Sequence, residues 1–256
     1  MRTRKRYAEG ESNDFNLSIS DLMSALCGIF ALIMITVVVQ LNTTKAEYVA
    51  KNQKAEEYYS MQTELYDDLI EEFEADLQKW NAEITKDLTI RFKNDDILFE
   101  PFKKELKPKF KLILIGGKIE GEKPIKPEEA FFPRLIKVIS KTAYRDKIEE
   151  IRIEGHTSRE QNKEFDIDYI EGMELSQGRT REVMLCCLNS KGINNKDKEW
   201  AQKNIAAIGY SLSRPVKYEN GKDNWEASRR VEFKIKTKAE KVIEELADKE
   251  FKVTHE

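Results

Sequence analysis

The chain has 256 residues, enough for one or two domains, and its 44 basic and 47 acidic side chains leave a formal net charge of −3. With 36% charged residues it has the composition of a soluble, strongly polar protein, and we expect no direct contact with nucleic acid. Three cysteines and two histidines, without metal-ligand spacing, argue against zinc or thiol chemistry. We therefore expect no bound metal and no cofactor.

One strongly apolar segment stands out from this polar composition. Leu22 to Thr44 contains 23 residues without a charge, which is long enough to cross the roughly 30 Å hydrocarbon core of a membrane. We predict a short tail over 1–16 and a transmembrane helix over 17–44. A buried core helix is the alternative, although the segment lacks a polar stripe after Ser24. A cleaved signal peptide is disfavoured, because acidic residues separate the basic start from the apolar segment and no small-residue cleavage site follows it.

Positive charge sets the expected orientation of this helix. The chain starts with "MRTRKR", and short basic segments stay on the cytoplasmic side. We therefore expect a single-pass protein of a bacterial inner membrane, with a cytoplasmic N-terminus and everything after Lys45 in the periplasm.

A single carboxylate, Asp21, stands at the N-terminal edge of the apolar segment. Three small residues, Ser24, Ala25 and Gly28, follow it on the same helix face. An aspartate at the centre of a bilayer costs roughly 2.5–3.5 kcal/mol on insertion scales, and small residues let helices approach closely in lipid. We expect Asp21 to face a protein partner or a wet pocket and to carry an ion there, because dry surroundings favour the neutral acid. The alternative is that Asp21 only caps a helix starting near Leu22.

The next segment, 45–87, contains no Gly or Pro and is rich in helix-forming residues. We predict a helical stalk over this range. Large apolar residues follow a heptad spacing that Thr63 interrupts: Tyr59, Tyr66, Ile70, Phe73, Leu77, Trp80 and Ile84. Such a face either pairs with a second helix, as in a homodimer, or packs onto the chain's own domain.

The remainder, 88–237, mixes strand and helix patterns in the order β-α-β-α-β-β. Strands are expected at 88–92, 96–100, 148–157, 204–210 and 229–237, and helices at 134–143 and 173–192, the second ending at Gly192. In the last strand Val231, Phe233 and Ile235 share one face. We predict the α+β class, a sandwich with helices on one side of a sheet, followed by a surface helix within a tail over 238–256.

The apolar segment resembles a known family. "SISDLMSALCGIFALIMI" is similar to the single span of MotB-type stator subunits, with Asp21-Leu22-Met23-Ser24-Ala25 at the family's motif, although the usual upstream tryptophan is missing. The resemblance implies two copies of this chain inside a pentameric ring of a multi-span MotA-like partner. It also implies that a proton or sodium ion passing Asp21 drives rotation.

The distal segment resembles the OmpA-like peptidoglycan-binding domain. Five blocks match in order: "ILFEPFKKELKPKFKLIL", "IRIEGHTS", "ELSQGRTREV", "GYSLSRPV" and "SRRVEFKI". The resemblance implies an OmpA-like fold over 88–237 and binding of the diaminopimelate of a peptidoglycan stem peptide. It implies these binding positions: Arg179, Ser158, Leu175, Gly172 and Arg230.

Two of these positions depart from the family pattern. Ser158 stands where the family has an aspartate, and Gly172 where it has an asparagine. The long loop between the two matching blocks carries Asp166 and Asp168, either of which could supply the missing acid; the alternative is that both are ordinary solvated loop residues. Arg179, whose planar guanidinium suits a carboxylate, could also be a structural helix arginine.

Other residues have structural interpretations. His156 is expected to close its strand through hydrogen bonds, and Arg229 and Arg230 could simply anchor the last strand to the core. No nucleophile or metal set for hydrolysis of the cell wall is visible, so we do not expect an enzyme.

As a whole, the chain is most similar to the ZorB family, the MotB-like component of Zorya anti-phage defence. The diverged motif, the long helical segment and the altered wall-binding set favour this family over a flagellar stator. The alternatives are a flagellar MotB-like subunit and a passive, membrane-anchored wall-binding protein without ion transport.

Overall fold

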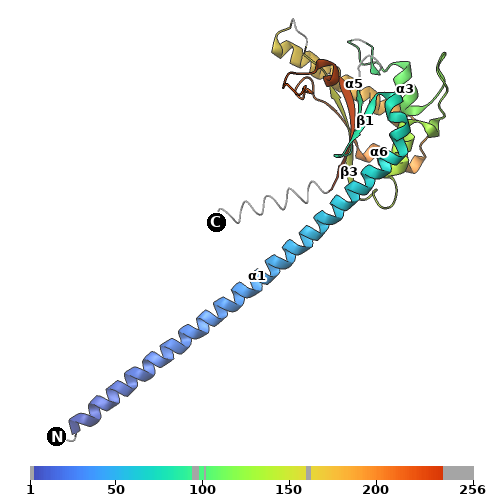
Figure 1. Cartoon of the computed structure of the whole chain (residues 1–256). Coiled ribbons are helices and arrows are strands. Elements are labelled where there is room, and N and C mark those ends of the chain that lie inside the picture. Colours follow the sequence, from blue (N-terminus) through green and yellow to red (C-terminus); the bar gives the residue numbers. More distant parts are fainter. Residues whose placement is uncertain (1–2, 94–97, 101, 160–162, 239–256) are drawn as a thin grey trace. The chain divides into compact units, whose positions relative to one another are not determined.

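The structure, a computed structural model, describes the backbone of residues 3–93, 98–100, 102–159 and 163–238 (Figure 1). Side chains are described from Ser20 onwards. It contains two compact units, one up to Lys54 and one from Ala55, which we describe separately. Helix α1 (Thr3–Trp80) contributes to both units.

The first unit is the N-terminal part of α1. From Leu22 to Leu41 its large apolar side chains point in all directions and are exposed; Leu32, for example, is 66% exposed. Within the described residues, α1 is the one helix that is long and apolar enough to cross a membrane by length and composition. The predicted span over 17–44 lies within it.

The second unit begins with the C-terminal part of α1, which is a core helix. Met61, Leu65, Leu69 and Phe73 are buried in the domain at successive turns, because a spacing of four residues keeps side chains on one helix face. The predicted heptad face overlaps this face only in part, since Phe73 and Trp80 are buried whereas Tyr59 is 54% exposed. Two interpretations of the predicted heptad face were open, pairing with a second helix and packing onto the chain's own domain. The structure shows this part of α1 packed onto its own domain.

The predicted helical stalk is wrong at its C-terminal end. Helix α1 ends at Trp80, because Asn81 adopts a left-handed backbone with φ of 51°, a conformation that asparagine tolerates better than most residues. Strand β1 (Ala82–Thr85) follows and pairs in antiparallel fashion with β2 (Thr89–Lys93).

A five-stranded sheet organises the domain, in the order β1-β2-β5-β3-β4. Strand β3 (Ile148–His156) runs parallel to β4 (Ile205–Gly209) and antiparallel to β5 (Arg230–Thr237), which pairs with β2. Alternation along β3 and β5 gives the sheet one apolar and one charged face. Val231, Phe233 and Ile235 lie together on the apolar face, as predicted.

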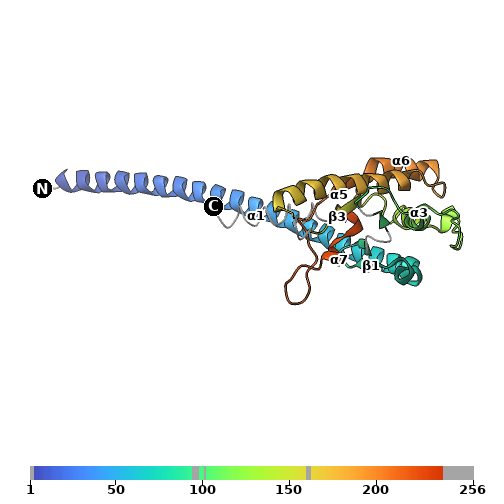
Figure 2. The ribbon, with the colours of Figure 1, turned by 90° about the horizontal axis from the view of Figure 1, so that it is seen from above.

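Helices complete the core against the apolar face. They are α3 (Pro108–Ile115), α4 (Phe131–Ile139), α5 (Phe165–Leu188) and α6 (Asn195–Asn204). The 3-10 helix η1 (Pro127–Glu129) and the short helix α7 (Trp225–Ser228) precede α4 and β5 and add no apolar residue to this core. Figure 2 shows α5 lying along β3 and leading into α6. Aromatic rings join the layers: Phe131 of α4 lies 5.0 Å, between ring centroids, from both Phe92 and Phe233. The α+β class is confirmed.

Several predicted boundaries differ from the structure. Helix α5 starts eight residues before Met173, and its C-cap is Asn189 rather than Gly192. Gly192 instead packs closely against the Pro127 carbonyl, where a Cβ would clash. Of the strand expected at 96–100, Phe99 forms an isolated bridge with Leu106, and 96–97 lie outside the described residues. The surface helix expected in the tail also lies outside them, from residue 239 onwards.

Candidate functional site

A cavity of about 760 Å³ opens at one end of the sheet. It lies between the N-terminal half of α5, the loop that follows β3 and the segment from Phe99 to Glu105. The cavity brings together four of the five predicted binding residues: Ser158, Gly172, Leu175 and Arg179.

Helix α5 presents one face to this cavity. Asp168, Gly172, Leu175 and Arg179 follow one another at spacings of four, three and four residues, which places them on one side of a helix. Gly172 is required by close packing, because a Cβ there would lie 2.6 Å from the Ser211 hydroxyl oxygen. The glycine thus lets α5 approach the strand ends, and it offers the cavity no polar side chain.

Arg179 is held rigidly at one end of this face. The side chain is 4% exposed, and its Nε donates a hydrogen bond to the Lys103 carbonyl at 2.9 Å. The guanidinium carbon lies 4.6 Å from the centroid of the Phe99 ring. These contacts orient a planar cation along the wall of the cavity, where it suits recognition of a carboxylate.

The structure distinguishes between the two acids considered as substitutes for the family aspartate. Asp168 lines the cavity and is 4% exposed, whereas Asp166 lies exposed in the first turn of α5. The sequence could not separate them, because their placement depends on where α5 begins. At the rim, Lys163 pairs with Glu171 at 2.6 Å between Nζ and Oε2.

Arg229, rather than the expected Arg230, lines the cavity. Arg229 Nη1 donates a hydrogen bond to the Ser158 hydroxyl at 3.3 Å. Arg230 is buried away from the cavity, where its Nε donates to Glu232 at 2.7 Å and its Nη1 to the carbonyl oxygens of Arg214 and Ser228. The predicted role of Arg230 as a strand anchor therefore fits its contacts better than a binding role.

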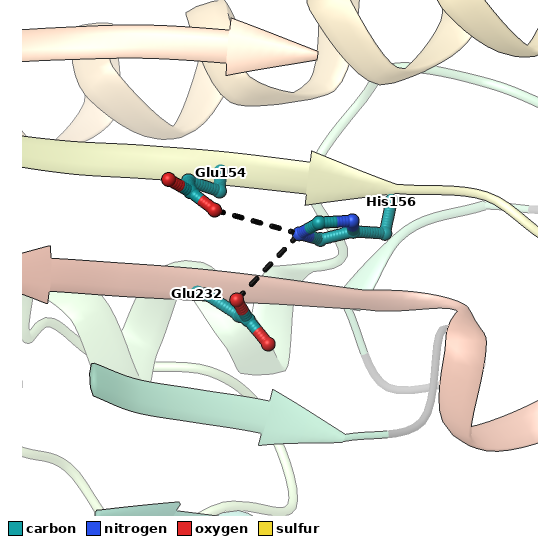
Figure 3. Close-up of side chains that lie close together, drawn as sticks. All are labelled: Glu154, His156 and Glu232. Carbon is teal, nitrogen blue, oxygen red and sulfur yellow. Dashed lines mark ion pairs between the residues drawn. The ribbon is translucent and has the colours of Figure 1, made fainter. Parts of the chain in front are cut away.

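A second cluster lies on the charged face of the sheet (Figure 3). His156 Nε2 lies 3.6 Å from Glu232 Oε2 and 3.9 Å from Glu154 Oε2, and the three side chains are buried. The His156 ring stacks on Tyr210, with 5.3 Å between centroids. His156 is the last residue of β3 and pairs with Arg230 across the sheet, whereas neither of its ring nitrogens forms a hydrogen bond within the described chain.

The cluster shifts the ionisation of its members. Burial lowers the pKa of His156, and the charge of Arg230 lowers it further, although the neighbouring glutamates act in the opposite direction. Burial alone would raise the pKa of Glu232, but His156 and Arg230 beside it outweigh burial and hold the pKa of Glu232 far below its usual range. Glu232 is therefore ionised throughout the physiological range.

Asp21 lies in the other unit, on the exposed part of α1. Ser24, Ala25 and Gly28 are exposed on the same face, and the Ser24 hydroxyl donates back to the Ser20 carbonyl at 2.8 Å. A Cβ on Gly28 would meet no atom within 4 Å, so this face is open to a neighbouring helix.

The three cysteines are free. Burial raises the pKa of the Cys186 thiol to about 11 and that of the fully buried Cys187 well above its usual value. Both remain protonated at neutral pH, which disfavours thiolate chemistry.

Comparisons with known proteins place the chain in a family. No family model matches it. The Zorya protein ZorB of Escherichia coli strain Crooks is 39% identical over 239 residues, which cover 92% of this chain and 93% of that protein.

Solved structures give more distant matches. A MotB-like protein from Desulfovibrio vulgaris is 20% identical with a TM-score of 0.44, covering 72% of this chain and 95% of that one. The cell wall anchor of the type VI secretion system from Pseudomonas aeruginosa is 15% identical with a TM-score of 0.41, covering 66% and 96%. The periplasmic domain of Helicobacter pylori MotB is 18% identical with a TM-score of 0.37, covering 64% and 85%. By its identity and coverage with the E. coli protein, the chain belongs to the ZorB family of Zorya proteins, and its apolar N-terminal helix makes it a single-pass inner-membrane member of that family.

Proposed function

We propose that this chain is the B-type subunit of an ion-driven rotary membrane motor in Zorya anti-phage defence. The observation that carries the proposal is the match to ZorB along 92% of the chain, together with an apolar helix that has a single acid at its N-terminal edge. In this proposal the N-terminus is cytoplasmic and the domain from Ala55 is periplasmic. Two copies of the chain stand inside a pentameric ring of multi-span MotA-like subunits.

Asp21 carries the ion, a proton or sodium, in this motor. Ser24, Ala25 and Gly28 follow Asp21 on its face of α1, and the large apolar side chains that come after them are exposed. A lone helix of this kind cannot form a conducting pathway, so the ring subunits must supply the other wall. An acid at such an interface gains and loses a cation as its surroundings alternate between dry and wet.

The domain binds the peptide part of peptidoglycan through the cavity beside α5. Arg179 and Asp168 are separated by eleven residues on one helix face, about 16 Å at 1.5 Å per residue. That spacing exceeds the length of a single amino acid and suits a stem peptide that lies along the helix. Arg179 then holds a carboxylate, and Asp168 provides the negative charge that Ser158 lacks, for an ammonium group.

Binding to isolated cell-wall sacculi tests the anchoring role. The detergent-solubilised full chain is sedimented with sacculi, and Arg179→Ala is expected to lose most of the binding. Asp168→Asn is expected to weaken it, whereas the matched change Asp166→Asn on the exposed side of α5 leaves it unchanged. Adding Ser158→Asp to Asp168→Asn should restore part of the loss. Equal binding by Arg179→Ala and the parent would remove the anchoring role.

Protection of cells against phage tests the motor role. Asp21→Asn is expected to abolish protection while the chain still reaches the membrane and co-purifies with its multi-span partner. Asp21→Glu, which keeps the charge, is expected to retain part of the activity. A passive wall-binding anchor predicts full protection by Asp21→Asn, so the two functions give opposite results.

A further inference from the structure

The charged face of the sheet places two buried glutamates directly opposite each other. Glu154 on β3 pairs in register with Glu232 on β5, and the residues are 2% and 6% exposed. Like charges at directly opposed positions of an antiparallel pair destabilise a sheet. An arrangement of this kind requires positive charge between the two carboxylates.

The arginines of this face satisfy one glutamate much better than the other. Glu232 Oε1 accepts hydrogen bonds from Arg91 at 2.6 Å and from Arg230 at 2.7 Å. The nearest cationic nitrogens to Glu154 belong to Arg214, at 3.5 Å from Oε2, and to Arg152, at 3.7 Å from Oε1. Glu154 Oε1 has no hydrogen-bond partner among the described residues.

His156 completes the cluster and is the observation that points to a ligand. Its side chain is 1% exposed and is aimed between the two carboxylates (Figure 3). Neither ring nitrogen has a hydrogen-bond partner within the described chain, although buried polar groups in proteins are paired in the great majority of cases. Stacking against Tyr210 fixes the plane of the ring.

The three donor atoms converge with the spacing of a metal centre. His156 Nε2 lies 3.6 and 3.9 Å from the Oε2 atoms of Glu232 and Glu154, and the donor atoms all lie within 4.8 Å of one another. Ligands bound at about 2.0–2.2 Å in a tetrahedral site lie about 3.3–3.6 Å apart, so a small contraction would close the site. We propose that Glu154, His156 and Glu232 bind one divalent transition-metal ion of the zinc class.

The donor set decides the class of ion. An imidazole with two carboxylates suits zinc and its neighbours, whereas calcium and magnesium require six or more ligands, mostly oxygen. The two positive charges of a divalent cation would neutralise the two carboxylates. Arg91 and Arg230 donate hydrogen bonds to Oε1 of Glu232, so its Oε2 remains directed at His156. Arg91 also pairs with Glu83 at 2.7 Å, so its charge is shared with a third acid. The fourth position is left for a water molecule.

The site would tie together two segments that line the wall-binding cavity. Thr157 and Ser158 follow His156 directly, and Arg229 is separated from Glu232 by two residues. A metal bridge between β3 and β5 would therefore fix the end of β3, from which Thr157 and Ser158 extend, relative to the start of β5, which Arg229 precedes. This is a structural role, independent of whether the cavity binds peptidoglycan.

Metal analysis of the purified full chain tests the proposal. The chain is stripped with a chelator and titrated with Zn²⁺, and with Co²⁺ as a visible probe of tetrahedral coordination. The expected result is about one ion per chain and a thermal midpoint that rises with the metal and falls with the chelator. His156→Gln is expected to weaken binding about 10- to 100-fold or more. His255→Gln, at the second histidine of the chain, is expected to bind like the parent.

If a variant fails to fold, the metal content of the parent chain alone decides whether the site exists. Absence of stoichiometric metal in the folded parent, at micromolar concentrations of free ion, would overturn the proposal and leave a network of protein charges. Undiminished binding by a folded His156→Gln chain would also overturn it, because the metal would then lie elsewhere.

Discussion

The two parts of helix α1 differ in what surrounds them, although both are rich in large apolar residues. From Leu22 to Leu41 the apolar side chains point in all directions and are exposed, whereas from Ala55 they are concentrated on one face and are buried in the domain. A helix that is apolar all round requires lipid or a protein partner, and one with a single apolar stripe requires a core on that side. The angular distribution of apolar residues, rather than helix propensity, thus tells the two parts apart.

Truncating a core residue of the second part should give the largest effect. Phe73→Ala is expected to lower the free energy of unfolding of the domain by about 3–5 kcal/mol, because the ring contacts Trp80 and Phe131 and leaves a cavity when removed. The three tryptophans all lie after Ala55, so their fluorescence during urea unfolding in detergent reports on this unit. Phe30→Ala in the first part is the matched control, and an equal loss from both changes would remove the distinction between the parts.

A charged residue introduced into the first part of α1 tests whether its exposed apolar side chains face lipid. Ile33→Arg is expected to cost about 2.5–3.5 kcal/mol for membrane insertion and to reduce the fraction of the chain that resists carbonate extraction. Thr63→Arg, on the exposed side of the second part, should leave membrane insertion unchanged. Normal extraction behaviour of Ile33→Arg would mean that this side chain does not face lipid.

The second part of α1 is also held by one arginine of α4. Arg134 Nε binds Glu72 and its Nη1 binds Asp76, each at 2.7 Å, and its guanidinium carbon lies 4.9 Å from the centroid of the Phe73 ring. Arg134→Met is expected to lower the free energy of unfolding by about 1–3 kcal/mol, since two acids lose their partner. Lys79→Met, which removes an exposed partner of Asp76, should cost less than about 0.5 kcal/mol. Similar losses from both substitutions would contradict this difference.

A smaller, pH-dependent contribution comes from Asp68 on the same part of α1. Hydrogen bonds from Lys141 and Tyr144, both at 2.7 Å, hold the pKa of Asp68 below its usual value. Because the folded pKa is lowered, the stabilisation is present above the unfolded pKa of about 3.9 and is lost as the pH falls through the folded pKa. Asp68→Asn should therefore cost less than about 1 kcal/mol at pH 7, and the difference from the parent should shrink toward pH 3. A gap in the free energy of unfolding that widens in acid would contradict the assignment.

Local patterns were enough to predict much of the fold. Alternating residues in 148–157 and 229–237 marked two adjacent strands of the sheet, and the uncharged stretch after Asp21 marked the apolar part of α1. The heptad pattern predicted only part of the buried face of α1. It included Phe73 and Trp80, which are buried, but not Met61, Leu65 and Leu69, which precede them at four-residue spacing. Strand β1 was missed because it follows a helix of strong propensity without a Gly or Pro between them.

The functional sites depended more on long-range register. Four of the residues named by family resemblance line one cavity, whereas the fifth, Arg230, lies outside it and its neighbour Arg229 lines it, because the first residue of β5 was not known. The cluster of Glu154, His156 and Glu232 could not be predicted. Glu232 follows His156 by 76 residues in the sequence, and the two meet only through the pairing of β3 with β5.

Ion flux through the reconstituted assembly tests the central claim most directly. The chain is purified with its multi-span partner, placed in liposomes with a pH or sodium gradient, and compared with Asp21→Asn and Asp21→Glu. The expected result is a flux that depends on the gradient, disappears in Asp21→Asn and persists at a reduced rate in Asp21→Glu. An intact Asp21→Asn assembly that conducts as well as the parent would contradict the proposal that this carboxylate carries the ion.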